Sequence, residues 1–353
     1  MDVPDFFTAA LPGVGGLVKA VPEDFVVEEI PAYPASGEGQ HLLLTVEKRG
    51  ITTREMVQRL ATALGCAADD IGTAGMKDRQ AVARQCVTVP AEGVDIAVVA
   101  NLVLEGIAVL SAMRHKNKLR TGHLRGNRFS IVVRGVGPDA LAAARAVLDA
   151  LSHSWLPNRF GAQRFGHRGD NADEGRALIA GTRRVSDRFK KRLFISALQS
   201  RMFNRYLAGR IADGTLHRAI VGEVLQRPAT GGLFLCAEAE IAYNQSRIDM
   251  RQVVPTGPMF GHAMFAPAEG SPAAEREAAI LEGEGLTLKS FEPLGRLAEG
   301  TRRPLLVRLE NATVTQEDDR LTVGFALPPG AYATVVLEEI MKPGAPLNVG
   351  GDP

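Results

Sequence analysis

One acidic residue is placed where it could do chemistry. Asp78 stands between Lys77 and Arg79 in a stretch rich in glycine and alanine, GTAGMKDRQAVARQ, which covers residues 72–85. Residues with so little side chain let a ligand approach the backbone closely, and the flanking cations favour the ionised carboxylate. Asp78 is therefore a candidate nucleophile or electrostatic stabiliser. The alternative is a surface turn in which Asp78 only pairs with its neighbours, because short motifs also arise by chance.

Hydrophobic periodicity predicts the elements that position this stretch. Strands are expected at residues 22–30, 41–47 and 84–90, where apolar and β-branched residues gather or alternate. A helix capped by Thr52 or Thr53 follows the second strand, with four apolar residues on one face. This order predicts an α+β fold with a mixed or antiparallel sheet and helices packed on it.

The remainder of the chain predicts an insertion. A strand at 126–136 and an alanine-rich helix at 137–151 precede a long helix that begins at Asp187. The periodic apolar residues of that helix, including Phe189, are expected in the core. Strands and a helix end the chain, so the first and last thirds are expected to share one sheet around a helical middle.

Composition limits the class of protein. The chain has 353 residues, of which 45% are hydrophobic and 23% charged, values typical of a soluble globular protein with two domains. We expect a cytoplasmic location, since the sequence has no apolar run of membrane-spanning length and no layout of a signal peptide. Three cysteines without a C-x-x-C pair argue against a disulfide framework or a zinc site, and we expect no metal.

Charge is unevenly distributed along a chain whose net charge is +1. Two clusters of basic residues could form a groove for a phosphate-rich partner, although a charge run is also typical of a solvated face. The first cluster, which contains no acid, consists of Arg114, Lys116, Lys118, Arg120 and Arg125. The second consists of Arg183, Arg184, Arg188, Lys190, Lys191 and Arg192, interrupted only by Asp187.

Two further segments carry residue types suited to RNA. Asn127 could bond to a base edge or be only a turn residue, and Phe129 could stack on a base. Residues 157–171, PNRFGAQRFGHRGDN, combine glycines, arginines such as Arg164 and two phenylalanines. Arginine pairs with phosphate and phenylalanine stacks on bases, so this segment is expected to face the ligand at a domain junction.

Five motifs together resemble the TruD family of tRNA pseudouridine synthases. They follow one another in the family's order and span nearly the whole chain. The motifs are PEDFVVEE (22–29), AGMKDRQAV (74–82), RHKNKLRTGHLRGNRF (114–129), NRFGAQRFG (158–166) and FALPPGAYAT (325–334).

The resemblance implies a fold, a reaction and a set of site residues. It implies a pseudouridine synthase catalytic domain at 1–157 and 305–353, with an inserted α/β TRUD domain at 158–304. The substrate would be the uridine at position 13 of tRNA. Asp78 would be the catalytic aspartate, without a cofactor, in a chain expected to be a monomer. The residues that match the family's positions around the target uridine are Phe25, Asn127, Phe129 and Tyr332.

The chemistry of such a reaction needs a charged carboxylate. Cleavage of the N1–C1′ bond builds positive charge at the sugar, which Asp78 could stabilise, trap covalently or relieve by accepting a sugar proton. The sequence does not decide between these roles. Lys19, Lys77 and Arg79 are candidate cations for Asp78, and Lys19 is favoured as a partner from another strand.

Three departures from the family pattern are Ala83 where Thr is common, Glu338 where Arg is common, and Tyr332 where Phe is common. Glu338 is expected to alter local pairing or RNA affinity. Two other classes remain open, namely a non-catalytic RNA-binding protein and a glycoside hydrolase. A hydrolase would typically need a second carboxylate, which Glu23, Asp24, Glu28 or Glu29 could supply, although these four are also typical of a solvated strand edge.

Overall fold

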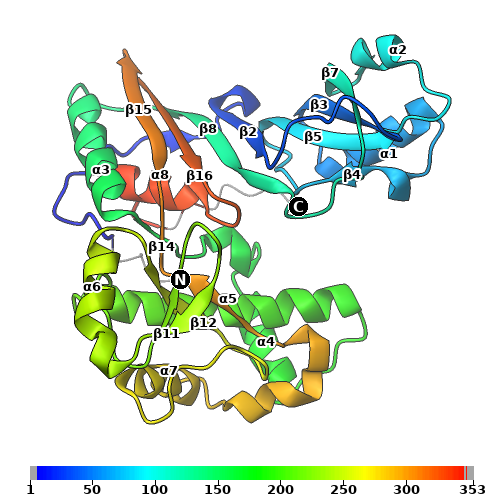
Figure 1. The fold of residues 1–353 in the computed structure, drawn as a ribbon. Coiled ribbons are helices and arrows are strands. Elements are labelled where there is room, and N and C mark those ends of the chain that lie inside the picture. The colour runs from blue at the N-terminus through cyan, green and yellow to red at the C-terminus, as the bar shows by residue number, and fades with distance from the viewer. Residues whose placement is uncertain (1–5, 346, 348–353) are drawn as a thin grey trace.

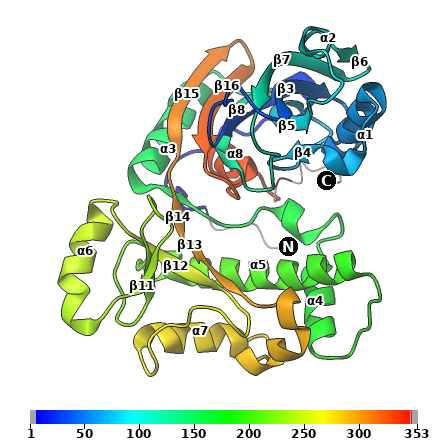
Figure 2. The same cartoon turned by 45° about the vertical axis from the view of Figure 1, so that its right-hand side comes forward.

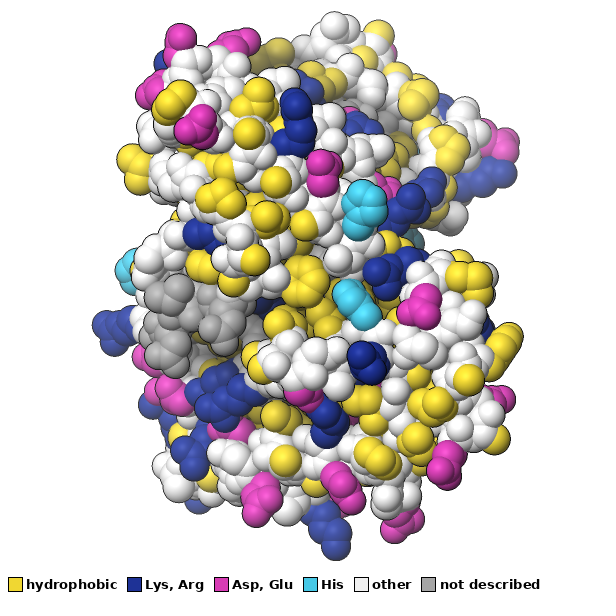
Figure 3. All heavy atoms as spheres, turned by 90° about the vertical axis from the view of Figure 1, so that its left-hand side faces the viewer, with side chains coloured by type: hydrophobic (Ala, Val, Ile, Leu, Met, Phe, Trp, Pro, Cys, Tyr) yellow, Lys and Arg dark blue, Asp and Glu magenta, His cyan; other side chains and the backbone are white. Residues whose placement is uncertain are grey.

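The computed structural model describes residues 6–345 and 347. The chain forms an upper part and a lower part, each built on its own sheet (Figure 1). A space-filling view from the left-hand side of Figure 1 shows a waist between the two parts (Figure 3).

The upper part is built on a mixed sheet that, within the described residues, has ten strands. Eight of them lie in the order β15-β16-β8-β2-β5-β3-β7-β6, while β1 pairs with β8 and β4 with β5. All pairings are antiparallel except that of β2 with β5. The strands are β1 (Leu17–Val18), β2 (Phe25–Pro31), β3 (His41–Arg49), β4 (Gly72–Thr73), β5 (Val82–Pro90), β6 (Val103–Leu104), β7 (Ile107–His115), β8 (Leu124–Arg134), β15 (Glu310–Glu317) and β16 (Arg320–Leu327).

This sheet confirms that the first and last thirds of the chain share one fold. Strand β16, from the last third, pairs with β8 over eight consecutive positions, including Phe325 opposite Phe129. Helices α3 (Ala140–Ser154) and α8 (Ala333–Met341) pack on β2, β8 and β16, where Ile131, Leu148 and Val336 are fully buried. The site-bearing strands are therefore held in a continuous apolar core.

A second core supports the segment before Asp78. Helix α1 (Thr53–Leu64) buries Met56 and Leu60 against β3 and β5. It begins with a capping box in which the Thr52 hydroxyl accepts from the Glu55 N–H at 3.1 Å and the Glu55 carboxylate accepts from the Thr52 N–H at 2.7 Å. Such caps fix where a helix starts, and this helix start lies directly behind the Asp78 loop.

The lower part is made of helices around a small antiparallel sheet (Figure 2). Its strands, in spatial order, are β11 (Leu233–Leu235), β10 (Val224–Gln226), β12 (Val254–Met259) and β13 (Thr301–Pro304). Its helices are α4 (Asn171–Ile179), α5 (Arg188–Ala212), α6 (Ile241–Asp249) and α7 (Pro272–Glu282). The chain passes between the two parts at β9 (Leu156–Pro157) and β14 (Leu306–Val307), which pair with each other. The remaining short elements are α2 (Ile96–Ala100), η1 (Pro22–Asp24), η2 (Ala68–Asp70), η3 (Ala162–Phe165), η4 (Glu238–Glu240) and η5 (Leu288–Leu297).

Two sequence predictions about burial are wrong. The side chain of Phe189, expected in the core, is 72% exposed because it lies on the first turn of α5, beyond the packed part of that helix. Glu29, expected on a solvated strand edge, is buried because β2 is an internal strand between β8 and β5. Asp24, expected there too, lies at the end of η1 and is buried beneath the Arg134 guanidinium, from which it accepts hydrogen bonds. In the part of the chain that the structure describes, no helix is long and apolar enough to cross a membrane.

Candidate active site

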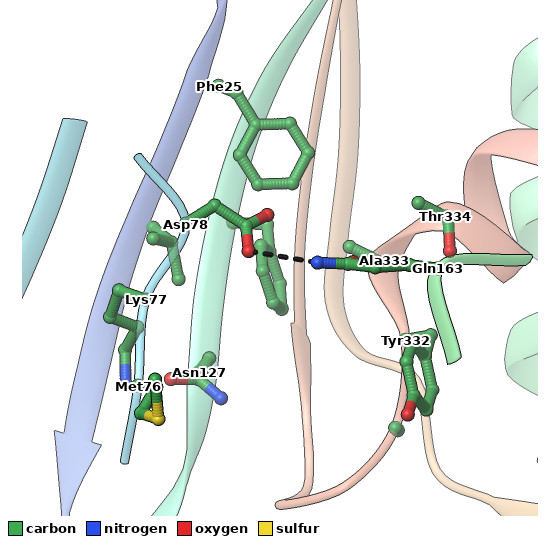
Figure 4. A pocket seen from close by; sticks show the side chains of 12 residues that line it. Phe25, Met76, Lys77, Asp78, Asn127, Gln163, Tyr332, Ala333 and Thr334 are labelled. Atoms are coloured by element: carbon green, nitrogen blue, oxygen red, sulfur yellow. Dashed lines mark hydrogen bonds between the residues drawn. The ribbon is translucent and has the colours of Figure 1, made fainter. Parts of the chain in front are cut away.

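A cavity of about 200 Å³ lies where strands β2 and β8, the Asp78 loop, η3 and the start of α8 meet. Asp78, Phe25, Asn127, Phe129 and Tyr332 all line it, so residues from four separate sequence motifs meet in one place (Figure 4). Lys19 reaches Asp78 from the end of β1. The structure therefore brings together every residue expected around the target base.

The Asp78 carboxylate is held by two donors. Lys19 Nζ lies 3.1 Å from Oδ2, and Gln163 Nε2 donates to Oδ1 at 3.3 Å (Figure 4). Lys19 is itself fixed, because its side chain is buried, its backbone φ is 58°, and its ammonium lies 4.3 Å from the centroid of the Phe25 ring. The carboxylate keeps 26% of its side-chain surface exposed, which leaves it open toward the cavity.

The other candidate cations bind elsewhere. Lys77 Nζ pairs with Glu29 at 2.9 Å in the interior of the sheet, and the Arg79 guanidinium pairs with Glu55 at 2.7 Å. The sequence neighbours of Asp78 thus anchor the loop on either side. The charge partner of Asp78 comes from 59 positions away in the chain.

Behind the loop lies a buried lysine that the sequence analysis missed. Lys48, at the end of β3, is fully buried, and its ammonium donates to the Asp78 carbonyl oxygen at 2.6 Å and to the Ile51 carbonyl oxygen at 2.8 Å. Burial lowers the pKa of this lysine to about 8. The Thr53 hydroxyl also accepts from the Lys77 N–H at 2.8 Å. These bonds hold the backbone of the loop at Lys77 and Asp78, and the backbone in turn determines the direction of the Asp78 side chain.

Aromatic rings form the walls of the cavity. The rings of Phe25 and Phe129 pack edge to face with centroids 6.1 Å apart, and Phe129 also contacts Phe325. Tyr332 packs against Phe160 on the opposite side, and desolvation raises the pKa of its phenol, which stays neutral. A flat base could be held between these two walls.

Two buried polar atoms at the cavity have no hydrogen-bond partner among the described residues, Asn127 Oδ1 and Thr334 Oγ1. Buried polar groups are nearly always paired in folded proteins, so each of these two atoms has capacity for a bond to a water molecule or a ligand. Thr334 and Gln163 are not among the site residues predicted from the sequence, although they lie in the motifs FALPPGAYAT (325–334) and NRFGAQRFG (158–166).

In the structure, three of the five side chains of the first basic cluster already have partners within the protein. Lys116 pairs with Glu38 at 2.6 Å, and Arg114 and Lys118 donate to the carbonyl oxygens of Gly39 and Asp69. The other two members, Arg120 and Arg125, are exposed. None of the five lines the cavity, so any contact with RNA by this cluster would lie outside it.

Arg164 lies nearer the cavity than the first cluster. It follows Gln163 in η3, donates to the Ser200 hydroxyl at 3.1 Å, and places its guanidinium 5.7 Å from the centroid of Phe160. Its other guanidinium nitrogens are not bonded among the described residues, so it keeps donors for a phosphate.

Two of the three departures from the family pattern, Glu338 and Ala83, lie in the interior of the protein. Glu338 is fully buried and pairs with Arg159, while its other oxygen accepts from the Leu347 N–H at 2.8 Å. It therefore ties the start of the lower part to α8 and is not placed to contact RNA. Ala83 is fully buried in β5, opposite Val27 of β2.

The cavity contains one carboxylate among the described residues, that of Asp78. The four acids considered for a second carboxylate are all paired with cations: Glu23 with Arg49, Asp24 with Arg134, Glu28 with Arg128 and Glu29 with Lys77. None lines the cavity, which disfavours a two-carboxylate hydrolase. No group of three or more His, Cys, Asp or Glu side chains in residues 6–345 and 347 is placed to hold a metal ion.

Comparisons with known proteins identify the family of the chain. The family described as tRNA pseudouridine synthase D (TruD) matches residues 4–185 and 172–340. A tRNA pseudouridine synthase D of Anaeromyxobacter sp. (strain Fw109-5) is 49% identical over 346 residues, with 96% of each chain covered. The protein of that name from Thermus thermophilus is 40% identical over 343 residues, covering 96% of this chain and 92% of that protein.

The fold has a counterpart among solved structures. A Methanosarcina mazei protein whose crystal structure carries the TruD name superposes with a TM-score of 0.78 at 22% identity, covering 97% of this chain and 96% of that one. That likeness bears on the fold, and the sequence matches bear on ancestry. The family match and the similar sequences show that the chain belongs to the tRNA pseudouridine synthase D (TruD) family.

Proposed function

We propose that this protein isomerises the uridine at position 13 of tRNA to pseudouridine, with Asp78 as the reacting carboxylate. The observation that carries the proposal is the cavity in which one carboxylate, held by Lys19 and Gln163, faces aromatic walls. A substrate tRNA is consistent with the names of the relatives and with the cytoplasmic location expected from the sequence. We expect a monomer that needs no cofactor.

Binding in this cavity requires the uridine to leave its stack, at a cost of a few kcal/mol. Stacking on an aromatic side chain returns about 1–3 kcal/mol per base, and Phe25, Phe129 and Tyr332 are available for it. Asn127 would bond to the uracil edge, because its Oδ1 is buried without a partner among the described residues. The closed walls would also keep water from the broken glycosidic bond.

The carboxylate then acts on the sugar. As the N1–C1′ bond breaks, its electron pair leaves with the uracil, and Asp78 either bonds to C1′ or takes a sugar proton. The uracil turns and C5 bonds to C1′, while the Asp78–C1′ bond breaks in the first case or Asp78 returns the proton to the sugar in the second. The C5 proton is then lost and N1 gains one, so the product is an isomer. In this proposal Lys19 balances the charge of the Asp78 carboxylate and Gln163 orients its second oxygen, which their contacts at 3.1 and 3.3 Å support.

We also propose that the boundaries of the catalytic and inserted domains are those expected from the sequence, 1–157 with 305–353 and 158–304. The pairing of β9 with β14 supports them, because the chain leaves and re-enters the upper part there. Gln163 belongs to the inserted segment but touches Asp78, so the proposed site needs both domains.

Incubating the purified protein with unmodified tRNA transcript, followed by carbodiimide labelling and primer extension, tests the proposal. We expect one new stop, at uridine 13, which Asp78→Asn abolishes while RNA binding persists. Asp149→Asn, which changes an exposed carboxylate on α3, is the matched control and should leave the stop intact. Tight RNA binding by the wild-type protein without any stop would instead support a non-catalytic RNA-binding protein.

A further inference from the structure

The first turn of α5 presents an aromatic ring to solvent amid basic residues. Phe189 is 72% exposed, and the cations that precede and follow it in the chain are exposed as well. We call this the α5 N-terminal surface; it consists of Phe189 with Arg184, Arg188, Lys190 and Arg192. A single exposed hydrophobic side chain is common on a protein surface, but a ring set among cations is suited to stack on a nucleic-acid base.

The charge of this surface is uncompensated. Within the described residues, none of its four cationic side chains forms an ion pair or a hydrogen bond, whereas Arg183 nearby is paired with Glu174. The one acid in the segment, Asp187, caps the helix by accepting from the N–H groups of Phe189 and Lys190. The helix N-terminus adds partial positive charge. By contrast, acidic and basic side chains are interspersed over the lower part of the face in Figure 3.

The geometry of α5 connects this surface to the cavity. Ser200 of α5 accepts from Arg164, and Asn204 exchanges two bonds with the Phe160 backbone, so one face of α5 holds the segment that carries Gln163 to Asp78. Phe189 precedes Ser200 by eleven residues, which at 3.6 residues per turn places the two within about 20° of each other around the helix. Phe189 therefore continues the same face, about 16 Å along the axis.

The same side of the molecule carries the upper elements that lead to Asp78. In Figures 1 and 2, α4 and the adjoining end of α5 lie on the right of the lower part, below β3, β4 and β5 of the upper part. A polymer bound at the cavity and extending in this direction would pass over the α5 N-terminal surface.

We propose that the α5 N-terminal surface binds the RNA strand that flanks the target nucleotide, with Phe189 stacking on a base and the four cations contacting phosphates. An aromatic ring set among cations is the arrangement that holds single-stranded RNA. This inference rests on the proposed function, because it takes tRNA as the substrate. It assigns recognition of the flanking strand to residues that lie outside the catalytic cavity.

The test compares Phe189→Ala and the triple variant R188Q/K190Q/R192Q with the full-length wild-type protein, by fluorescence anisotropy with unmodified tRNA transcript at several salt concentrations. Loss of one stacked base should weaken binding by roughly 5- to 140-fold. The triple variant should reduce the slope of log K against log salt by about 2. Turnover at saturating RNA should be unchanged in both, because neither variant alters the cavity.

Tyr243→Ala is the matched control, since Tyr243 is an aromatic residue of the lower part that is 65% exposed but lies on α6. Its binding should equal that of the wild type. All substituted side chains are exposed, so the variants should fold. Equal affinity of Phe189→Ala and Tyr243→Ala, with an unchanged salt slope in the triple variant, would overturn the inference. Pseudouridine formation by the wild-type protein reports separately on the proposed function.

Discussion

Replacement of Lys48 by Met isolates the contribution of the buried lysine behind Asp78. Methionine keeps an unbranched chain of similar length but removes the ammonium that donates to the carbonyl oxygens of Ile51 and Asp78. We expect turnover to fall, because the Asp78 backbone loses its anchor, while RNA affinity changes little. The variant should also differ from the wild type in how its free energy of unfolding depends on pH.

The magnitude follows from the pKa of Lys48, which burial lowers from its usual 10.5 to about 8 in the folded protein. Between these values the unfolded chain binds the proton and the folded protein does not, so the free energy of unfolding rises with pH across this window. For one such group, the gain between pH 7 and pH 10 is about 2.5 kcal/mol. Lys48→Met lacks the group and should lack this gain.

Urea denaturation of wild type and Lys48→Met at pH 7 and pH 10 measures the difference. The free energy of unfolding of the wild type, relative to the variant, should increase by about 2.5 kcal/mol at the higher pH. Lys289→Met, which replaces an exposed lysine, should track the wild type at both values. A wild-type to Lys48→Met difference that is the same at pH 7 and pH 10 would refute the account of Lys48 as a buried ammonium.

Three further outcomes are expected. Lys19→Met should lower turnover by about 10- to 100-fold, because the carboxylate loses one charge-assisted hydrogen bond. RNA affinity should change little. An unaltered rate would exclude Lys19 as the partner of the carboxylate. Gln163→Ala should reduce turnover by about 10-fold in single-turnover assays, the low end of the range for a hydrogen bond to a charged group. No reduction would show that the contact does not orient the carboxylate. Neutralising Arg114, Lys116 and Lys118 of the first basic cluster should weaken tRNA binding. It should also reduce the slope of log K against log salt by about 0.7 per phosphate contact. An unchanged slope would assign these residues to a solvated face.

Much of the fold was predictable because the strands and helices carry strong periodic patterns. The alternation in β8 and the apolar face of α1 are local signals, and both elements occur where expected. The depth of β2 was not predictable, since Glu28 and Glu29 look alike in sequence. Only the pairing of β2 with both β5 and β8 determines that Glu29 points inward, where Lys77 neutralises it.

The carboxylate and the aromatic residues of the proposed site were predictable, but the residues that support them were not. Asp78 is flagged by its glycine-rich setting, and the motifs bring in Phe25, Asn127 and Phe129. Lys48 carries no such signal, because a lysine at the end of an apolar strand normally reaches solvent. Its burial depends on the loop that folds over it from 30 positions away, and such long-range contacts are not encoded in any local pattern.

The pairing of β9 with β14 has a consequence for how this chain could change over generations. The two segments at which the chain passes between the upper and lower parts lie side by side. Insertions, deletions or replacements between them could therefore occur while the strands beneath Asp78 stay in register. Changes in the lower part and changes in the sheet that carries Asp78 could then accumulate separately. Two exceptions are Arg159 and Gln163, whose codons lie in the exchangeable block although their side chains contact Glu338 of α8 and the Asp78 carboxylate.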